Sequence, residues 1–269
     1  MDSMWICSLQ VPTVTRWNSF YEAVSKIKDD TKINKVCQAL ELPVIPPTEV
    51  QFLKDYSSVV KPVATAIDIL QGDKNCYLGC VLPTIKSLMA NVQNTPTSLA
   101  APLKTAILDG LHVRFDHLFR NEDFILAAVC HPKFKLSWID DPVEKARCTH
   151  MLESVCESMA TDVQSDSENA QSTDEDHDQF FVLHHSSTSS ASSQCLSYLS
   201  DSDRSLDMLT RYPKMKAVFI KYNTALPSSA PVERLFSAGS IILSKRRNRL
   251  SDETFEKLLL LRQNRHLIK

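Results

Sequence analysis

The sequence predicts a mostly α-helical protein. Apolar residues recur at spacings of three, four and seven over long stretches, as they do on one face of a helix. Proline-containing breaks at Pro43 to Pro47 and at Asn94 to Thr97 separate these stretches. No run of alternating apolar and polar residues indicates a strand. Residues 1–160 are therefore predicted to be a series of helices.

Four of these helices have well-defined apolar faces. Each face is expected to be buried against its neighbours, because an amphipathic helix packs with its apolar side toward the core. The faces consist of Val50, Leu53, Val60, Val63, Ile67 and Leu70, then Val81, Ile85, Leu88 and Val92, then Leu103, Ile107, Leu111, Phe115 and Leu118, and finally Val143, Ala146, Met151, Leu152 and Val155.

Residues 161–204 have a different composition. No Lys or Arg lies between Cys148 and Asp203, and an acidic stretch is followed by the serine-rich run Ser186 to Ser193. Such a segment buries too little apolar surface to offset an ordering entropy of roughly 1–2 kcal/mol per residue. We predict a disordered linker, in which the apolar island Phe180 to Leu183 could dock on a folded part.

Residues 205–269 return to helical periodicity. Pro231 is placed for the first turn of one helix, and Ser251 is placed to cap another. The final helix is unusually apolar for a terminal element, so we expect it to be buried against something. The apolar positions are Leu206, Leu209, Tyr212, Val218, Phe219 and Tyr222, then Val232, Leu235, Phe236, Gly239, Ile242 and Leu243, then Phe255 and Leu258 to Leu261.

Composition argues against several classes of protein. The four glycines are far apart, so no glycine-rich loop for nucleotide phosphates is expected, and no small-molecule substrate is predicted. No apolar run approaches the roughly 20 residues that span a bilayer, and no signal peptide is expected. The eight cysteines are scattered, which favours a reducing, intracellular compartment.

The segment from Tyr222 to Gly239, with its continuation through Leu261, resembles the C-terminal dimerisation region of hAT-family transposases. The hallmark is a Ser-Ser-x-x-x-Glu-Arg-x-Phe-Ser run, which here begins at Ser228. Upstream, Thr15 to Ser19 is similar to the family's Arg-Trp motif. Leu126 to Lys135 is similar to a segment that usually ends Asp-Pro-Arg-Phe-Lys. The resemblance implies a helical insertion domain at 1–160 and a C-terminal helical fragment of an RNase H-like transposase domain at 205–269.

The resemblance also implies a loss of catalysis. The family's centre uses two aspartates and a glutamate to hold two divalent ions for phosphoryl transfer. Glu233 stands at the position of the glutamate, but only Asp2 precedes the Arg-Trp motif, and the family's zinc-finger module has no counterpart. One carboxylate cannot hold two metals, so this chain is predicted not to be an enzyme and to need no cofactor. Mg²⁺ would bind only with the missing catalytic half. Taken alone, Glu233 reads as a first-turn carboxylate that the helix dipole favours.

Two clusters are candidate contacts to DNA, with weak binding expected. The resemblance suggests that Arg16 and Trp17 lie near a DNA end, whereas the simpler interpretation is a tryptophan that anchors the first helix. The basic run Lys245, Arg246, Arg247 and Arg249 could neutralise phosphates, direct nuclear import or form a solvated turn. A nuclear location is expected.

Cysteine and histidine spacings do not predict a metal site. Cys76 and Cys80 have no second pair nearby. The remaining candidates are irregularly spaced for zinc, namely Cys130, His131, Cys148, His150 and Cys156.

The predicted function is a dimerisation module derived from a transposase. The partner would be a second copy or a related transposase-like chain, because two apolar helices in 65 residues expose more surface than they bury alone. The expected interface consists of Val232, Leu235, Phe236, Phe255, Leu258, Leu259 and Leu261. The alternatives are a fragment or isoform of an active DNA transposase and a transposase-derived DNA-binding regulator.

Overall fold

The computed structural model describes residues 11–13, 17–27, 30–72, 76–161, 187–243 and 249–267. Every regular element within these ranges is a helix, so the predicted mostly α-helical fold is confirmed. None of the described helices has the length and apolarity needed to cross a bilayer.

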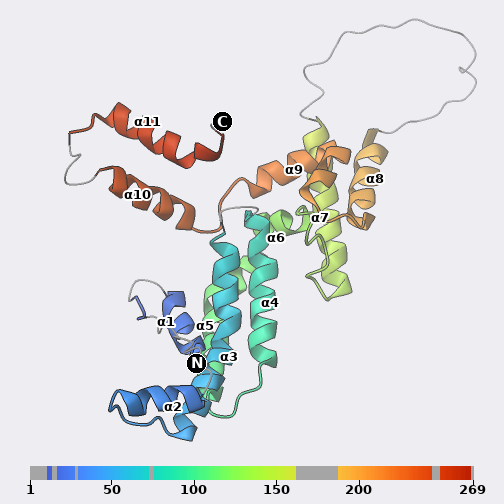
Figure 1. Ribbon diagram of the computed structural model, residues 1–269. Coiled ribbons are helices and arrows are strands. Elements are labelled where there is room, and N and C mark those ends of the chain that lie inside the picture. The colour runs from blue at the N-terminus through green and yellow to red at the C-terminus, as the bar shows by residue number, and fades with distance from the viewer. Residues whose placement is uncertain are drawn as a thin grey trace, which may run out of the picture.

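Eleven α-helices and four short 3₁₀ helices are described (Figure 1). The α-helices are α1 (Trp17–Ser25), α2 (Asp30–Ala39), α3 (Pro47–Leu70), α4 (Val81–Asn94), α5 (Ala101–Phe115), α6 (Glu122–Val129), α7 (Pro142–Thr161), α8 (Ser187–Ser200), α9 (Pro213–Asn223), α10 (Ala230–Ile242) and α11 (Asp252–Gln263). The 3₁₀ helices are η1 (Leu78–Cys80), η2 (Asp116–Arg120), η4 (Leu206–Arg211) and η5 (Arg265–Leu267).

Helices α3, α4 and α5 pack along one another (Figure 1). The face that periodicity predicted is buried on α4, partly buried on α3 and half-buried on α5. Val60 on α3 and Val92 on α4 are fully buried. A small core of Ala66, Leu88 and Val92 is closed by half-buried residues of α5, among them Ile107 and Leu111. In this part of the chain, local periodicity therefore identified the packed surfaces correctly.

Asp55 fixes the connection between α4 and α5. One oxygen of its buried carboxylate accepts hydrogen bonds from the backbone N–H groups of Ser98 and Leu99, each at 2.7 Å, and from the Thr97 hydroxyl at 2.9 Å. The bond from the Leu99 backbone contributes most to a pKa of Asp55 well below its usual range. The connection is therefore held against α3 by a carboxylate that stays ionised.

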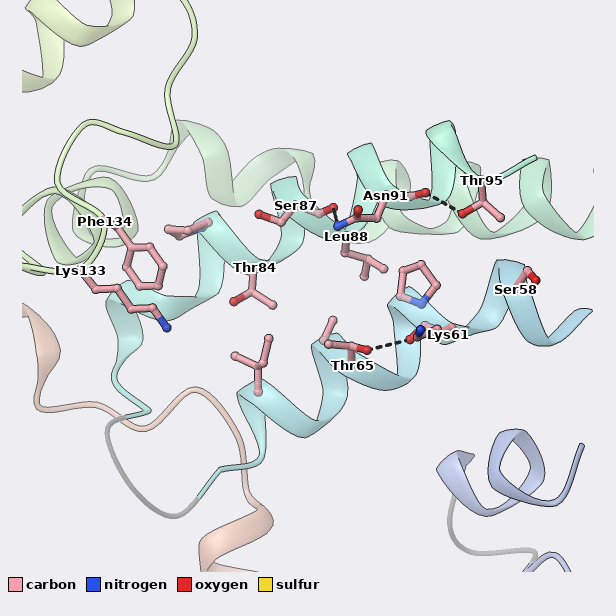
Figure 2. A pocket seen from close by; sticks show the side chains of 14 residues that line it. Ser58, Lys61, Thr65, Thr84, Ser87, Leu88, Asn91, Thr95, Lys133 and Phe134 are labelled. Atoms are coloured by element: carbon pink, nitrogen blue, oxygen red, sulfur yellow. Dashed lines mark hydrogen bonds between the residues drawn. The ribbon is translucent and has the colours of Figure 1, made fainter. Parts of the chain in front are cut away.

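A groove of about 470 Å³ lies between α3 and α4. Figure 2 shows Thr65, Thr84, Ser87 and Asn91 along its walls, with Lys133 at one end. None of the residues that line this groove is a predicted site residue, so it plays no part in the candidate site below.

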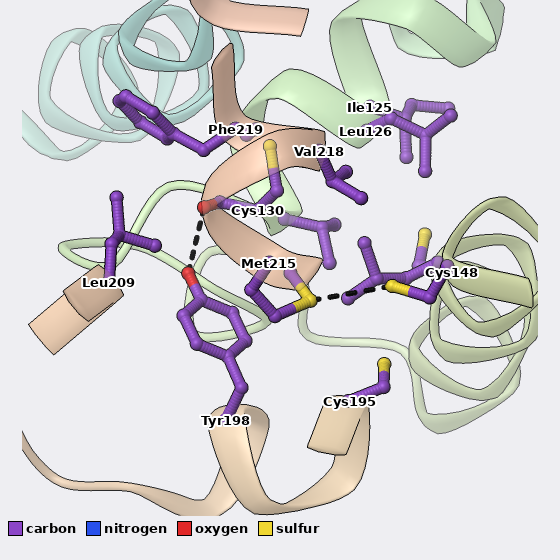
Figure 3. Close-up of a cluster of buried hydrophobic side chains, with 14 of the residues drawn as sticks. Ile125, Leu126, Cys130, Cys148, Cys195, Tyr198, Leu209, Met215, Val218 and Phe219 are labelled. Atoms are coloured by element: carbon purple, nitrogen blue, oxygen red, sulfur yellow. Dashed lines mark hydrogen bonds between the residues drawn. The ribbon is translucent and has the colours of Figure 1, made fainter. Parts of the chain in front are cut away.

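The largest core joins α6 and α7 to α8, η4 and α9 (Figure 3). Helix α7 turns Cys148, Leu152 and Cys156 inward, at positions i, i+4 and i+8. Val143 and Ala146, which we predicted on the apolar face of this helix, are exposed instead. The buried face of α7 therefore includes two cysteines, which a prediction based on large aliphatic residues does not identify.

The predicted linker over 161–204 is wrong for residues 187–200, which form α8. Helix α8 packs on α7 and buries Cys195 and Tyr198 completely. The Tyr198 hydroxyl donates a hydrogen bond of 2.8 Å to the backbone oxygen of Cys130 (Figure 3). Residues 162–186, with the predicted apolar island, lie outside the described residues.

The predicted domain boundary at residue 205 is also wrong. Met208, Met215 and Val218 are fully buried in the same core as Leu126 and Leu152, so η4 and α9 complete the packing of α6 and α7. We call α3 to α9, together with η1, η2 and η4, the body. The structural boundary lies after α9.

Candidate dimerisation surface

Helices α10 and α11 form a hairpin whose two helices pack on each other. Gly239 allows their close approach, because a Cβ atom there would lie 3.1 Å from Cζ of Phe255. Ser251 caps α11 as predicted, since its hydroxyl oxygen accepts a hydrogen bond from the Thr254 N–H. Figure 1 shows the hairpin standing away from the body.

The base of the hairpin is tied to the end of α3. The Ser228 hydroxyl donates a hydrogen bond of 2.9 Å to the Leu70 oxygen, and the Arg234 guanidinium donates one of 2.7 Å to the Gln71 oxygen. These bonds hold the start of α10 against the body, while the remainder of α10 packs on α11.

Much of the hairpin's apolar surface is exposed. Phe236 is 72% exposed, and its neighbours Val232 and Leu235 on the same face of α10 are also exposed. The exposed apolar residues of the two helices and their junction, which we call the hairpin surface, are Val232, Leu235, Phe236, Ile241, Leu243, Leu260 and Leu261. An exposed apolar patch of this kind commonly marks a protein–protein interface.

The predicted interface residues fall into two groups. Val232, Leu235, Phe236 and Leu261 belong to the hairpin surface. Phe255, Leu258 and Leu259 are half-buried. The predicted interface left out Ile241, Leu243 and Leu260. Ile241 lies outside the stripe at spacings of three and four, whereas Leu243 and Leu260 were recognised as apolar positions but not assigned to the interface.

Glu233 lies in the first turn of α10 and is exposed. The Ser229 hydroxyl donates a hydrogen bond of 2.6 Å to its carboxylate, and this contact takes the place of a side-chain cap by Ser229. Within the described residues, no group of three or more His, Cys, Asp or Glu side chains is placed to hold a metal ion.

The predicted DNA-contacting residues are only partly described. Trp17 is the first residue of α1, which packs on α3, and Arg249 is exposed shortly before α11. Arg16 and Lys245 to Arg247 lie outside the described residues.

The cysteines and histidines considered for zinc are mainly core residues. The structure does bring the Cys80 sulfur within 3.9 Å of His131 Nε2, a proximity that sequence spacing did not indicate. Burial lowers the pKa of His131 to about 4 and raises the pKa of the Cys148 thiol to about 11. Both groups are therefore neutral and inert near pH 7.

The comparison with known proteins addresses the same segment. Residues 181–265 match the hAT family C-terminal dimerisation region, a longer match than the predicted 205–269 because it begins upstream and takes in α8. No curated protein matches the chain. The chain therefore carries a hAT-family C-terminal dimerisation region and is related to the hAT-family transposases.

Proposed function

We propose that this chain is an interaction module that pairs through the hairpin surface with a second copy of itself or with a related transposase-like chain. The observation that carries the proposal is the exposure of Val232, Leu235 and Phe236 along one face of α10. The match of this segment to a dimerisation region supports it independently.

Burial of apolar surface would drive this association. Removing such surface from water contributes about 25 cal/mol per Å², and permanent interfaces are largely hydrophobic. Two copies related by a twofold axis would present the same patch to each other, so one set of side chains serves both sides of the interface.

The test of this interface is Phe236→Asp in the full chain. A carboxylate forced into an apolar interface must be desolvated, so we expect self-association to weaken by about 100-fold or more, which corresponds to about 2.7 kcal/mol. Sedimentation equilibrium over a micromolar concentration series measures the change.

The matched control is Val113→Asp on α5. Val113 is 85% exposed and lies outside the hairpin, so the same change of chemistry should leave association unaltered. A wild-type chain that sediments as a monomer throughout the series would contradict pairing with a second copy, and equal effects of the two substitutions would contradict the hairpin surface as the interface.

We also propose that these 269 residues do not cut DNA by themselves. In support, Glu233 is engaged by Ser229 and has the surroundings of an ordinary first-turn carboxylate. We expect no Mg²⁺-dependent nicking of supercoiled DNA above a buffer blank. Nicking that disappears with Glu233→Gln would refute this part of the proposal and favour the alternative of an active transposase fragment.

A further inference from the structure

A second site lies on the body, away from the hairpin. A hollow of about 350 Å³ opens between the segment that follows α6 and the turn that follows α8. The residues that line it include Lys133, Lys145 and Arg204, the acidic Asp201 and the hydroxyl-bearing Ser202. Lys133 also lines the groove between α3 and α4, and its charge acts on Cys80 and His131, so the basic residues assigned to this hollow are Lys145 and Arg204.

The acidic groups near this hollow are already engaged by other cations. Arg211 lies 3.0 Å from the Asp201 carboxylate and 2.8 Å from the Asp203 carboxylate. The Asp140 carboxylate interacts electrostatically with Lys145, but it forms an ion pair with the Lys86 ammonium group at 2.7 Å. Across the described ranges, neither Lys145 nor Arg204 forms an ion pair, so their charge is available to an anion.

Lys135 also lines the hollow but has a structural role. Its ammonium group donates a hydrogen bond to the Asp201 backbone oxygen and lies 4.9 Å from the centre of the Tyr198 ring. The side chain is buried, and burial is the main reason why its pKa is lowered, with Arg204 and Arg211 adding to the effect. Lys135 therefore holds the turn after α8 in place.

Ser202 is carried on that turn, and the turn is internally fixed. The Asp203 N–H donates to the Asp201 carboxylate, and the Ser205 N–H donates to the Asp203 carboxylate, each at 2.9 Å. Ser202 itself is exposed, and its hydroxyl has no hydrogen-bond partner among the residues that the structure covers. Ser202 is thus exposed and lines the same hollow as Lys145 and Arg204.

We propose that Ser202 is a phosphorylation site and that Lys145 and Arg204 bind the phosphate group once it is attached. A protein kinase would transfer the γ-phosphoryl group of a nucleoside triphosphate. The Ser202 oxygen forms the new bond to phosphorus, the bond from that phosphorus to the bridging oxygen breaks, and the nucleoside diphosphate leaves with the electron pair. The hydroxyl proton passes to a base of the kinase.

The chemistry of a phosphate monoester fits the hollow. It carries about −1.5 to −2 charges at pH 7 and three acceptor oxygens, which suit a cluster of Lys and Arg donors. Because Lys145 belongs to α7 and Ser202 to the turn after α8, the phosphate would crosslink two segments of the body. Phosphorylation would therefore stabilise the docking of α8.

The test places phosphoserine at position 202 during synthesis of the full chain and follows its ³¹P NMR shift with pH. The second pKa of a free phosphoserine is about 6, and nearby cations favour the dianion. We expect that pKa to fall by roughly half a unit to one unit at Ser202. Lys145→Gln combined with Arg204→Gln should return it toward the free value.

The matched control is phosphoserine at Ser200, which is exposed in the same acidic stretch but does not line the hollow. Equal pKa values at the two positions, or no response to the paired Gln substitutions in a chain with unchanged circular dichroism, would overturn the phosphate site. Phosphopeptide mapping of the chain from its own cells should find phosphate on Ser202. Complete absence of phosphate there under phosphatase inhibition would overturn the modification. Either result is independent of whether the hairpin dimerises.

Discussion

Gly79→Ala is expected to destabilise the body by more than about 3 kcal/mol, at or beyond the upper end of ordinary overpacking. A Cβ atom at Gly79 would lie 2.2 Å from the backbone oxygen of Ala127 and 2.8 Å from the side-chain oxygen of Asn223. The first of these neighbours is backbone in α6, a helix buried in the largest core, so it cannot move aside without repacking that core. Urea unfolding followed by circular dichroism measures the loss.

Gly110→Ala is the matched control for this substitution. Gly110 lies within α5, where the nearest atom to a new Cβ would be an Arg114 nitrogen at 3.6 Å. Alanine there should raise stability by about 0.5–1 kcal/mol, because glycine is unfavourable inside a helix. If Gly79→Ala unfolded at the same urea concentration as the wild-type chain, the close approach of η1 and α6 would be disproved.

Asn223→Leu is the second substitution with a large expected effect. The buried Asn223 amide accepts a hydrogen bond of 2.8 Å from the Gly79 N–H and donates one of 3.1 Å to the Ala127 oxygen. Leucine is close to asparagine in size, but it leaves the Gly79 N–H without this acceptor and the Ala127 oxygen with only the weak hydrogen bond from the Cys130 thiol. Each unpaired group costs about 1–3 kcal/mol, so a loss of about 2–5 kcal/mol is expected. The midpoint of thermal unfolding should fall accordingly.

Asn91→Leu provides the comparison. Asn91 is exposed on α4, and its side chain bonds only to the Ser87 oxygen of its own helix, at 2.8 Å. Its replacement should therefore change stability by less than about 0.5 kcal/mol. Similar losses at Asn223 and Asn91 would mean that the Asn223 amide does not join α9 to η1 and α6. Because Gly79 and Asn223 touch, their double variant should not show additive losses.

Periodicity was sufficient to predict most of the helices and several of their faces. Val81, Ile85, Leu88 and Val92 recur on one side of α4, and all four are buried. The spacing of apolar residues is a local property, so it identifies the buried face of a helix without knowledge of what the helix packs against. The same reasoning located α10 and its exposed stripe at Val232, Leu235 and Phe236.

Helix α8 could not be predicted in this way. Its composition is dominated by serine, and its buried contacts come from Cys195 and Tyr198, three residues apart. They are buried by α7, by the end of α6 and by Tyr212 at the start of α9, so tertiary packing outweighs a composition that by itself is typical of a linker. Likewise, the run Leu258 to Leu261 is apolar all round and gives no indication of which leucines face outward.

The largest core contains residues from both inside and outside the matched family region, and this affects how fragments of the chain would behave. Residues 181–265 match one family region, yet Cys195, Met208 and Met215 within it are buried against α6 and α7, which lie outside that match. A fragment that begins at residue 181 would expose these side chains to water. It would then aggregate through core side chains that are buried in the intact chain. Self-association of such a fragment would therefore not report on the hairpin surface. Dimerisation should be measured with the intact chain.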